Sequence, residues 1–247
     1  MDQIIEIIAG LVAVIFIFAP HEFAHAFIAD KNGDSTARMQ GRLSLNPLRH
    51  IDPTGFVLCA LTGFGWAKPV PINPSNFRNY RKGMFWTAVA GVITNYIIAF
   101  VAYPLYLLIF KYVYVENYAF FYNNYFLSCV VEVLYLSFYL IYAYGMSVFV
   151  FNLLPLFPLD GFRVVESLTR EINPVRRFLE TYGKYILLIL VLESFLCSTV
   201  VRYTDLYIID YFNVLGWISK FAQNIIGYPI KALWDWVFGY GLPVMVW

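Results

Sequence analysis

The sequence predicts an all-α polytopic membrane protein with about four to six transmembrane helices and a short β-hairpin or re-entrant loop after the first span. Composition is the first reason. Of the 247 residues, 60% are hydrophobic and only 13% are charged, whereas water-soluble domains carry about 25% charged residues. The mean hydropathy is +0.64. Most of the surface is therefore expected to face lipid.

Four apolar runs are the second reason, because each is near the roughly 20 residues that a helix needs to cross about 30 Å of hydrocarbon. They cover residues 4–28, 85–110, 133–154 and 185–201. The first run has an alternative interpretation as a secretory signal peptide, but such a peptide begins with basic residues and ends at a small-residue cleavage site. Asp2 and Glu6 occupy its start, so we expect a retained transmembrane helix.

The distribution of basic residues predicts the orientation in the membrane. Eight of the 17 Lys and Arg residues lie between Lys31 and Lys82, four arginines lie between the third and fourth runs, and the connection after the second run has only Lys111. Short basic loops stay in the cytoplasm, so the N-terminus is predicted outside. We expect a multi-pass protein of the plasma membrane. The basic residues form no single patch, which argues against nucleic acid as a partner.

The first inner loop and the C-terminal region are less regular. Residues 43–77 are rich in Pro and Gly around short apolar pieces at 56–64 and 70–72, which favours short strands in a re-entrant loop, since such backbone at membrane depth needs protein or a water-filled cavity around it. Residues 1–202 are predicted to form one core domain. Residues 203–247 are rich in Trp and Tyr and interrupted by charges, so we expect amphipathic segments at the outer interface, with one further span as the alternative.

The strongest chemical signal is His21-Glu22-Phe23-Ala24-His25, an H-E-x-x-H motif. Positions four apart share one face of a helix, so both imidazoles can bind one Zn²⁺ while Glu22 acts on a water beside it. The alternative is a pair of helix-end histidines without a metal. Ionisable side chains inside an apolar span are costly, however, and by default indicate a functional site.

A catalytic zinc site normally has three protein ligands, and two residues are candidates for the third. His50 is the remaining histidine, but it lies in the Pro-rich loop. Asp160 follows Pro155 and Pro158, which end the third apolar run. Alone, its Pro-Leu-Asp-Gly context is typical of a turn or a helix N-cap. The motif lies roughly 5–15 Å from the cytoplasmic end of its helix, and Asp160 is predicted at the same end, so we favour Asp160.

The three cysteines, Cys59, Cys129 and Cys197, are odd in number and widely spaced. They match no disulfide or metal framework. We therefore expect them to be packing residues.

These motifs resemble the site-2 protease family of intramembrane zinc metallopeptidases, in its compact form without PDZ or CBS domains. The resemblance covers roughly residues 15–170 and includes two further stretches, Gly-Trp-Ala-Lys-Pro-Val-Pro-Ile-Asn-Pro at 65–74 and Asn-Leu-Leu-Pro-Leu-Phe-Pro-Leu-Asp-Gly at 152–161. It implies His21, His25 and Asp160 as ligands of one zinc per chain, and Glu22 as the catalytic acid/base.

The resemblance also implies a substrate-binding role for one asparagine. The family has a Gly-Pro-x-x-Asn element, and the matching residues here are 91–95, with Val92 in place of the proline. Asn95 keeps the polar group. The alternative for Asn95 is an interhelical hydrogen bond, worth about 0.6 kcal/mol in membranes.

The predicted function is zinc-dependent hydrolysis of peptide bonds in or near transmembrane segments of membrane-protein substrates, with the active site toward the cytoplasmic side of the bilayer. Two alternatives stay open: a divalent-cation transporter and an inactive zinc-binding membrane scaffold. A transporter needs a polar path across the bilayer, and the outer half of the first run has only Glu6. The intact Glu22 argues against a scaffold. Substrate identity, a requirement for a prior cut, and the oligomeric state are not predicted.

Overall fold

Four long helices dominate the structure, a computed structural model that describes residues 2–62, 65–204 and 206–239. They are α1 (Asp2–Lys31), α4 (Tyr80–Leu108), α6 (Tyr125–Asn152) and α8 (Pro174–Thr204). Each is long and apolar enough to cross a membrane, so the four predicted spans correspond to four candidate membrane-spanning helices. Between α4 and α6 lie the π-helical η3 (Ile109–Val115) and α5 (Tyr118–Asn123).

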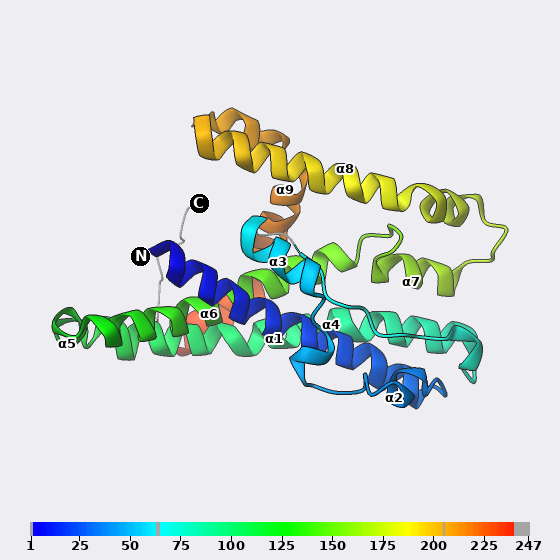
Figure 1. The fold of residues 1–247 in the computed structure, drawn as a ribbon, viewed down its shortest axis with the longest axis horizontal. Helices are drawn as coiled ribbons and strands as arrows, with labels where there is room; N and C mark the ends of the chain where they lie inside the picture. Colours follow the sequence, from blue (N-terminus) through cyan, green and yellow to red (C-terminus); the bar gives the residue numbers. More distant parts are fainter. Residues whose placement is uncertain (1, 63–64, 205, 240–247) are drawn as a thin grey trace.

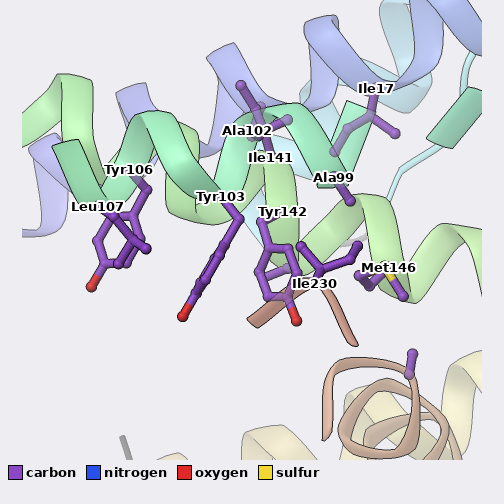
Figure 2. Close-up of a cluster of buried hydrophobic side chains, with 13 residues drawn as sticks. Ile17, Ala99, Ala102, Tyr103, Tyr106, Leu107, Ile141, Tyr142, Met146 and Ile230 are labelled. Carbon is purple, nitrogen blue, oxygen red and sulfur yellow. The ribbon is translucent and has the colours of Figure 1, made fainter. Parts of the chain in front are cut away.

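Helices α1, α4 and α6 form the core bundle, with α4 running opposite to the other two (Figure 1). Small residues at their contacts let the backbones approach closely; these buried residues include Ala13, Ala99, Ala102 and Ala143. Larger buried side chains fill the remaining space, among them Tyr103, Tyr142 and Met146 (Figure 2). The C-terminal ends of α1 and α6 therefore lie at the same end of the bundle (Figure 1). His25 lies shortly before the end of α1, and Asp160 lies shortly after the end of α6.

Helix α8 runs beside this bundle and is far less covered by protein, since only 6% of the residues in its most apolar stretch are buried. Among the described residues its contacts come chiefly from α7 (Asp160–Leu168) at one end and from the C-terminal segments at the other (Figure 1). Most of its apolar surface is therefore left for lipid or another helix.

The loop after α1 corrects one prediction, because no strand forms among its described residues. It contains α2 (Thr36–Met39), η1 (Pro47–Arg49), α3 (Pro53–Thr62) and η2 (Pro74–Asn76). The predicted β-hairpin is reduced to an isolated antiparallel bridge between Ile51 and Ala67. Helix formation takes over because Asp52 Oδ1 accepts a hydrogen bond from Gly55 N at 2.9 Å and Pro53 suits a first helical position. Residues 63–64 of the predicted apolar piece lie outside the description.

The C-terminal region folds back onto the bundle as short helices. These are η4 (Tyr207–Phe212), α9 (Val214–Phe221), the π-helical η5 (Ala222–Ile226) and α10 (Tyr228–Val237). None belongs to a candidate span. Trp234 packs on Phe100 with ring centroids 5.4 Å apart, and its indole N–H donates to the Phe100 carbonyl at 3.2 Å. Residues 240–247 lie outside the description, and a position at the outer interface stays a prediction.

Candidate metal centre

The two motif histidines lie on one face of α1, one turn apart. His21 and His25 are each only 5% exposed, and their Nε2 atoms lie 2.9 Å from one another. This convergence follows from the helical spacing, since residues four apart are neighbours on the helix surface. Both Nε2 atoms therefore point to the same small volume.

Asp160 reaches that volume from the start of α7. Helix α6 ends at Asn152, as the prolines at 155 and 158 predict, and the Phe157–Pro158 peptide bond in the connection is cis. Asp160 Oδ2 lies 3.3 Å from His21 Nε2 and 3.2 Å from His25 Nε2. The structure thus brings together the three side chains that the sequence singles out as metal ligands.

The three groups fit a zinc ion. Each offers one ligand atom, and the ligand atoms lie within 4.8 Å of one another. Two imidazole nitrogens and a carboxylate oxygen form a common zinc ligand set, and ligands about 2.0 Å from a tetrahedral ion are roughly 3.3 Å apart. Asp160 Oδ2 is also buried without a hydrogen-bond partner. Such an oxygen is costly unless something positive contacts it, and a cation at this position provides that contact.

Charge at the site favours an ionised carboxylate. Without a metal ion, burial alone would raise the pKa of Asp160, but attraction to a protonated His25 outweighs burial and lowers the pKa below its usual range. With both imidazoles neutral, a bound cation would favour the carboxylate in the same direction. Asp160 also lies in the first turn of α7, where the helix dipole favours negative charge. The residue is therefore available as an anionic ligand.

A second layer of hydrogen bonds orients the histidines. His25 Nδ1 lies 2.7 Å from the main-chain oxygen of Thr87, so this nitrogen carries the proton and leaves the Nε2 lone pair for a metal. His21 Nδ1 lies 3.1 Å from the side-chain amide of Asn95. A half-turn of that amide exchanges its nitrogen and oxygen, and Oδ1 then accepts the proton of His21.

Asn95 is fully buried and, in the structure, it contacts His21. The substrate-binding role implied by the family resemblance stays a prediction. The acceptor from Thr87 is a backbone atom, so side-chain patterns contain no signal for it.

Gly91 lets α4 approach the histidines, and in the sequence it is marked only as the first residue of the element that ends at Asn95. A Cβ at this position would lie 2.4 Å from His25 Nε2 and 2.7 Å from His21 Cε1. Real Cβ atoms essentially never come so close. Glycine is therefore needed for α4 to close over the imidazoles.

Glu22 and His50 have different placements. Glu22, 8% exposed, lies beside the two histidines in the sequence, and its Oε2 accepts a hydrogen bond of 2.7 Å from the main-chain N–H of Val70. His50 is buried in the loop, where its Nε2 contacts the Ser44 carbonyl oxygen at 2.6 Å. Among the described residues it is not part of the metal-ligand cluster, so Asp160 and not His50 completes the set.

The fold and the site define a polytopic membrane protein with a buried His-His-Asp centre and an adjacent glutamate, the residues of a metal-dependent hydrolase. Residues 9–194 match the model of peptidase family M50, and the chain belongs to this family, which confirms the resemblance to site-2 proteases. The protein is therefore a metalloprotease, and zinc is the metal that its family implies.

A relative in Bacillus subtilis (strain 168) supports the same assignment. The protein named "Putative zinc metalloprotease YwhC" is 37% identical to this chain over 183 residues, which are 73% of this chain and 78% of the relative. No solved structure matches the chain.

Proposed function

We propose that this metalloprotease is an intramembrane endopeptidase of the site-2 type, which cuts membrane proteins in or near their transmembrane segments. One observation supports this above all others: His21 and His25 lie within α1, which is long and apolar enough to span a bilayer, and they meet Asp160, which follows the similarly long and apolar α6. Buried ionisable groups at such a depth are expensive and mark function. We place the site toward the cytoplasmic side of the plasma membrane.

The chain's own residues divide the chemistry between them. His21, His25 and Asp160 would hold one zinc ion per chain. Zinc, when bound, would polarise the scissile carbonyl and lower the pKa of a water molecule toward about 7. Glu22 takes the proton of the attacking water and passes it to the leaving amine. The Thr87 carbonyl and Asn95 hold the two imidazoles in place.

The substrate must present an extended backbone, because a helix hides its amides. Residues 67–73 supply a non-helical segment beside Glu22, with Ala67 paired to Ile51 and the Val70 N–H bonded to the carboxylate. We propose that an unwound substrate segment lies along these residues by edge pairing. Photo-crosslinkers at positions 66 and 72 are expected to capture substrate. Crosslinks confined to α4 would contradict this pairing.

Glu22→Gln tests the proteolytic function. The variant keeps the metal ligands, so it is expected to retain zinc and lose cleavage. Membrane proteomics of cells with the wild type or Glu22→Gln should show, in the variant, accumulation of uncut proteins and loss of fragments with one truncated tail. Glu6→Gln is the matched control, since Glu6 is an exposed glutamate of α1, roughly 22 Å from His21 along the helix. Equal fragment patterns for the wild type and Glu22→Gln would contradict the proposal.

A zinc chelator separates the alternatives. Proteolysis that stops with chelator and resumes with zinc favours the endopeptidase. Zinc uptake into vesicles without proteolysis would favour a transporter, and zinc binding with neither activity would favour a scaffold. The sequence offers little for transport, since the α1 segment before His21 has few polar side chains.

A further inference from the structure

The loop between α1 and α4 contains an arginine in an unusual setting. Arg42 is only 8% exposed. Among the described residues no carboxylate pairs with it; its Nη2 instead donates to the main-chain oxygens of Lys68 at 2.7 Å and Pro69 at 3.3 Å. Burying a guanidinium group is costly. The hydrogen bonds to the two carbonyl oxygens therefore offset part of the cost of burying this charge.

Those two carbonyls belong to the residues immediately before Val70. The Val70 N–H is the donor that reaches Glu22 Oε2 at 2.7 Å. Val70 itself is buried, and its side chain packs with Ala26 and Ala37. A continuous path of contacts thus leads from the Arg42 guanidinium, through the backbone of residues 68–70, to the carboxylate beside the metal ligands.

We propose that Arg42 is a positioning residue for proton transfer by Glu22: it holds the backbone of residues 68–70 so that the Val70 N–H fixes the Glu22 carboxylate. The terminal torsion of a glutamate is broad and roughly two-fold, and a hydrogen bond to Oε2 selects one orientation. Oε1 is then the oxygen left to take the proton of the attacking water. Arg42 itself touches neither substrate nor metal ligand.

An arginine suits this role better than a lysine. One guanidinium nitrogen reaches two successive carbonyls, and the planar group is held with less loss of side-chain freedom per hydrogen bond than a flexible ammonium. The kcat of Arg42→Lys is therefore expected to lie between that of the wild type and that of a variant with a neutral side chain at this position.

The inference rests on the proposed function, so the assay first establishes that function. The probe is a quenched-fluorescent peptide with one apolar membrane segment and polar tails, in detergent–lipid micelles with the full-length protein. Cleavage by the wild type but not by Glu22→Gln supports the proposed function whatever the Arg42 variants do. Absence of wild-type cleavage would instead count against the proposed function itself.

Arg42→Gln is the principal variant, and Arg49→Gln is its control because Arg49 is an exposed arginine of the same loop. Misplacing a catalytic group by an ångström costs about a hundredfold, so kcat of Arg42→Gln is expected to fall about ten- to hundredfold. KM should stay within about twofold of the wild-type value and zinc content should not change, because Arg42 contacts neither the substrate nor a metal ligand and its loss leaves ground-state substrate binding as it is. Arg42→Lys should recover part of the rate.

Two results with Arg42→Gln would overturn the proposal. A raised KM with unchanged kcat would assign Arg42 to substrate binding. A raised kcat would mean that the Val70 N–H holds Glu22 in an inactive position.

A pair of Val70 variants decides the question even if Arg42→Gln does not fold. Val70→Ala keeps the N–H and shortens the side chain, whereas Val70→Pro removes the donor as well. The proposal predicts a kcat for Val70→Pro about tenfold or more below that of Val70→Ala. Equal kcat values for the two variants would show that the N–H contact does not position Glu22.

Discussion

Two polar clusters among the described residues differ in their chemistry: one is buried and the other is partly buried. In the first, His21, His25 and Asp160 converge with an unpartnered carboxylate oxygen between them. In the second, near α10, the Tyr103 hydroxyl donates to Asp235 Oδ1 at 3.2 Å and Lys231 Nζ lies 5.8 Å from the ring centre of Tyr142. The first cluster leaves acceptors facing one another, whereas the second matches donors to acceptors.

The difference teaches how a binding site is told from a structural polar contact inside a membrane protein. Buried polar atoms without a partner cost free energy unless a ligand supplies the contact. Among the described residues, Asp160 Oδ2 is the atom of this kind that faces the two imidazoles; the others include Arg42 Nε, His50 Nδ1 and Arg176 Nε, which lie outside the metal-ligand cluster. The Tyr103–Asp235 pair contributes none. We therefore assign the chemistry to the first cluster and docking of the C-terminal helices to the second.

The largest effect is expected from removing the carboxylate of each cluster in turn. Asp160→Ala deletes a proposed metal ligand, and even residues that only orient ligands cost 10–100-fold when changed, so cleavage should fall by more than about a hundredfold. Asp235→Ala should keep cleavage within a few-fold of the wild type. Initial rates on the quenched-fluorescent peptide measure both. Similar losses in the two variants would erase the distinction between the clusters.

Gly91→Ala tests the close approach of α4 to the imidazoles. The added Cβ would lie 2.4 Å from His25 Nε2 and would therefore displace His25. A shift of about 1 Å in a catalytic group costs about a hundredfold in rate. Gly10→Ala on α1 is the control, because nothing lies within 4 Å of its added Cβ. Rates and thermal stability should be measured together. Full activity of Gly91→Ala would show that the histidines do not need this contact.

Asn95→Leu separates two roles of the asparagine. Loss of the contact to His21 should weaken zinc affinity about 10–100-fold, measured by competition with a chelating dye. Thr94→Val is the neighbouring control, since Thr94 Oγ1 bonds only the Ala90 carbonyl of its own helix at 2.8 Å among the hydrogen bonds described. Unchanged zinc affinity with a raised KM would instead favour the substrate-binding role.

Asp34 predicts the smallest effect, on stability and its pH dependence. Burial would raise the pKa of this carboxyl, but hydrogen bonds from Thr36, Asn76 and Asn73 outweigh burial and lower it. A lowered folded-state pKa stabilises the fold above the unfolded value, near about 4, and this contribution is lost as pH falls through the folded-state pKa.

Asp34→Asn should therefore lower stability by about 1.5–3 kcal/mol at neutral pH, and less below about pH 4. Thermal unfolding of both proteins at several pH values tests this expectation. A difference between them that stays constant with pH would contradict it.

The spans and the metal ligands could be predicted from sequence because their signals are local. Apolar runs mark membrane helices, and the four-residue spacing places His21 beside His25. The prolines before Asp160 end the third apolar run, which predicts that Asp160 lies at the same end of the bundle as the two histidines. Other features depend on backbone atoms brought together by folding. The Thr87 carbonyl, the Val70 N–H and the space left by Gly91 have no side-chain pattern. The β-hairpin prediction was wrong. It relied on the many Pro and Gly residues of the loop and gave too little weight to Asp52, which caps the N-terminus of α3.

Zinc content tests the central claim most directly. The full-length wild type, Asp160→Ala and Asp235→Ala proteins would be purified in parallel and their zinc counted by mass spectrometry of the metal. The account predicts about one zinc per chain in the wild type and in Asp235→Ala, and a large loss in Asp160→Ala. Equal zinc in all three proteins would contradict the assignment of the metal to His21, His25 and Asp160.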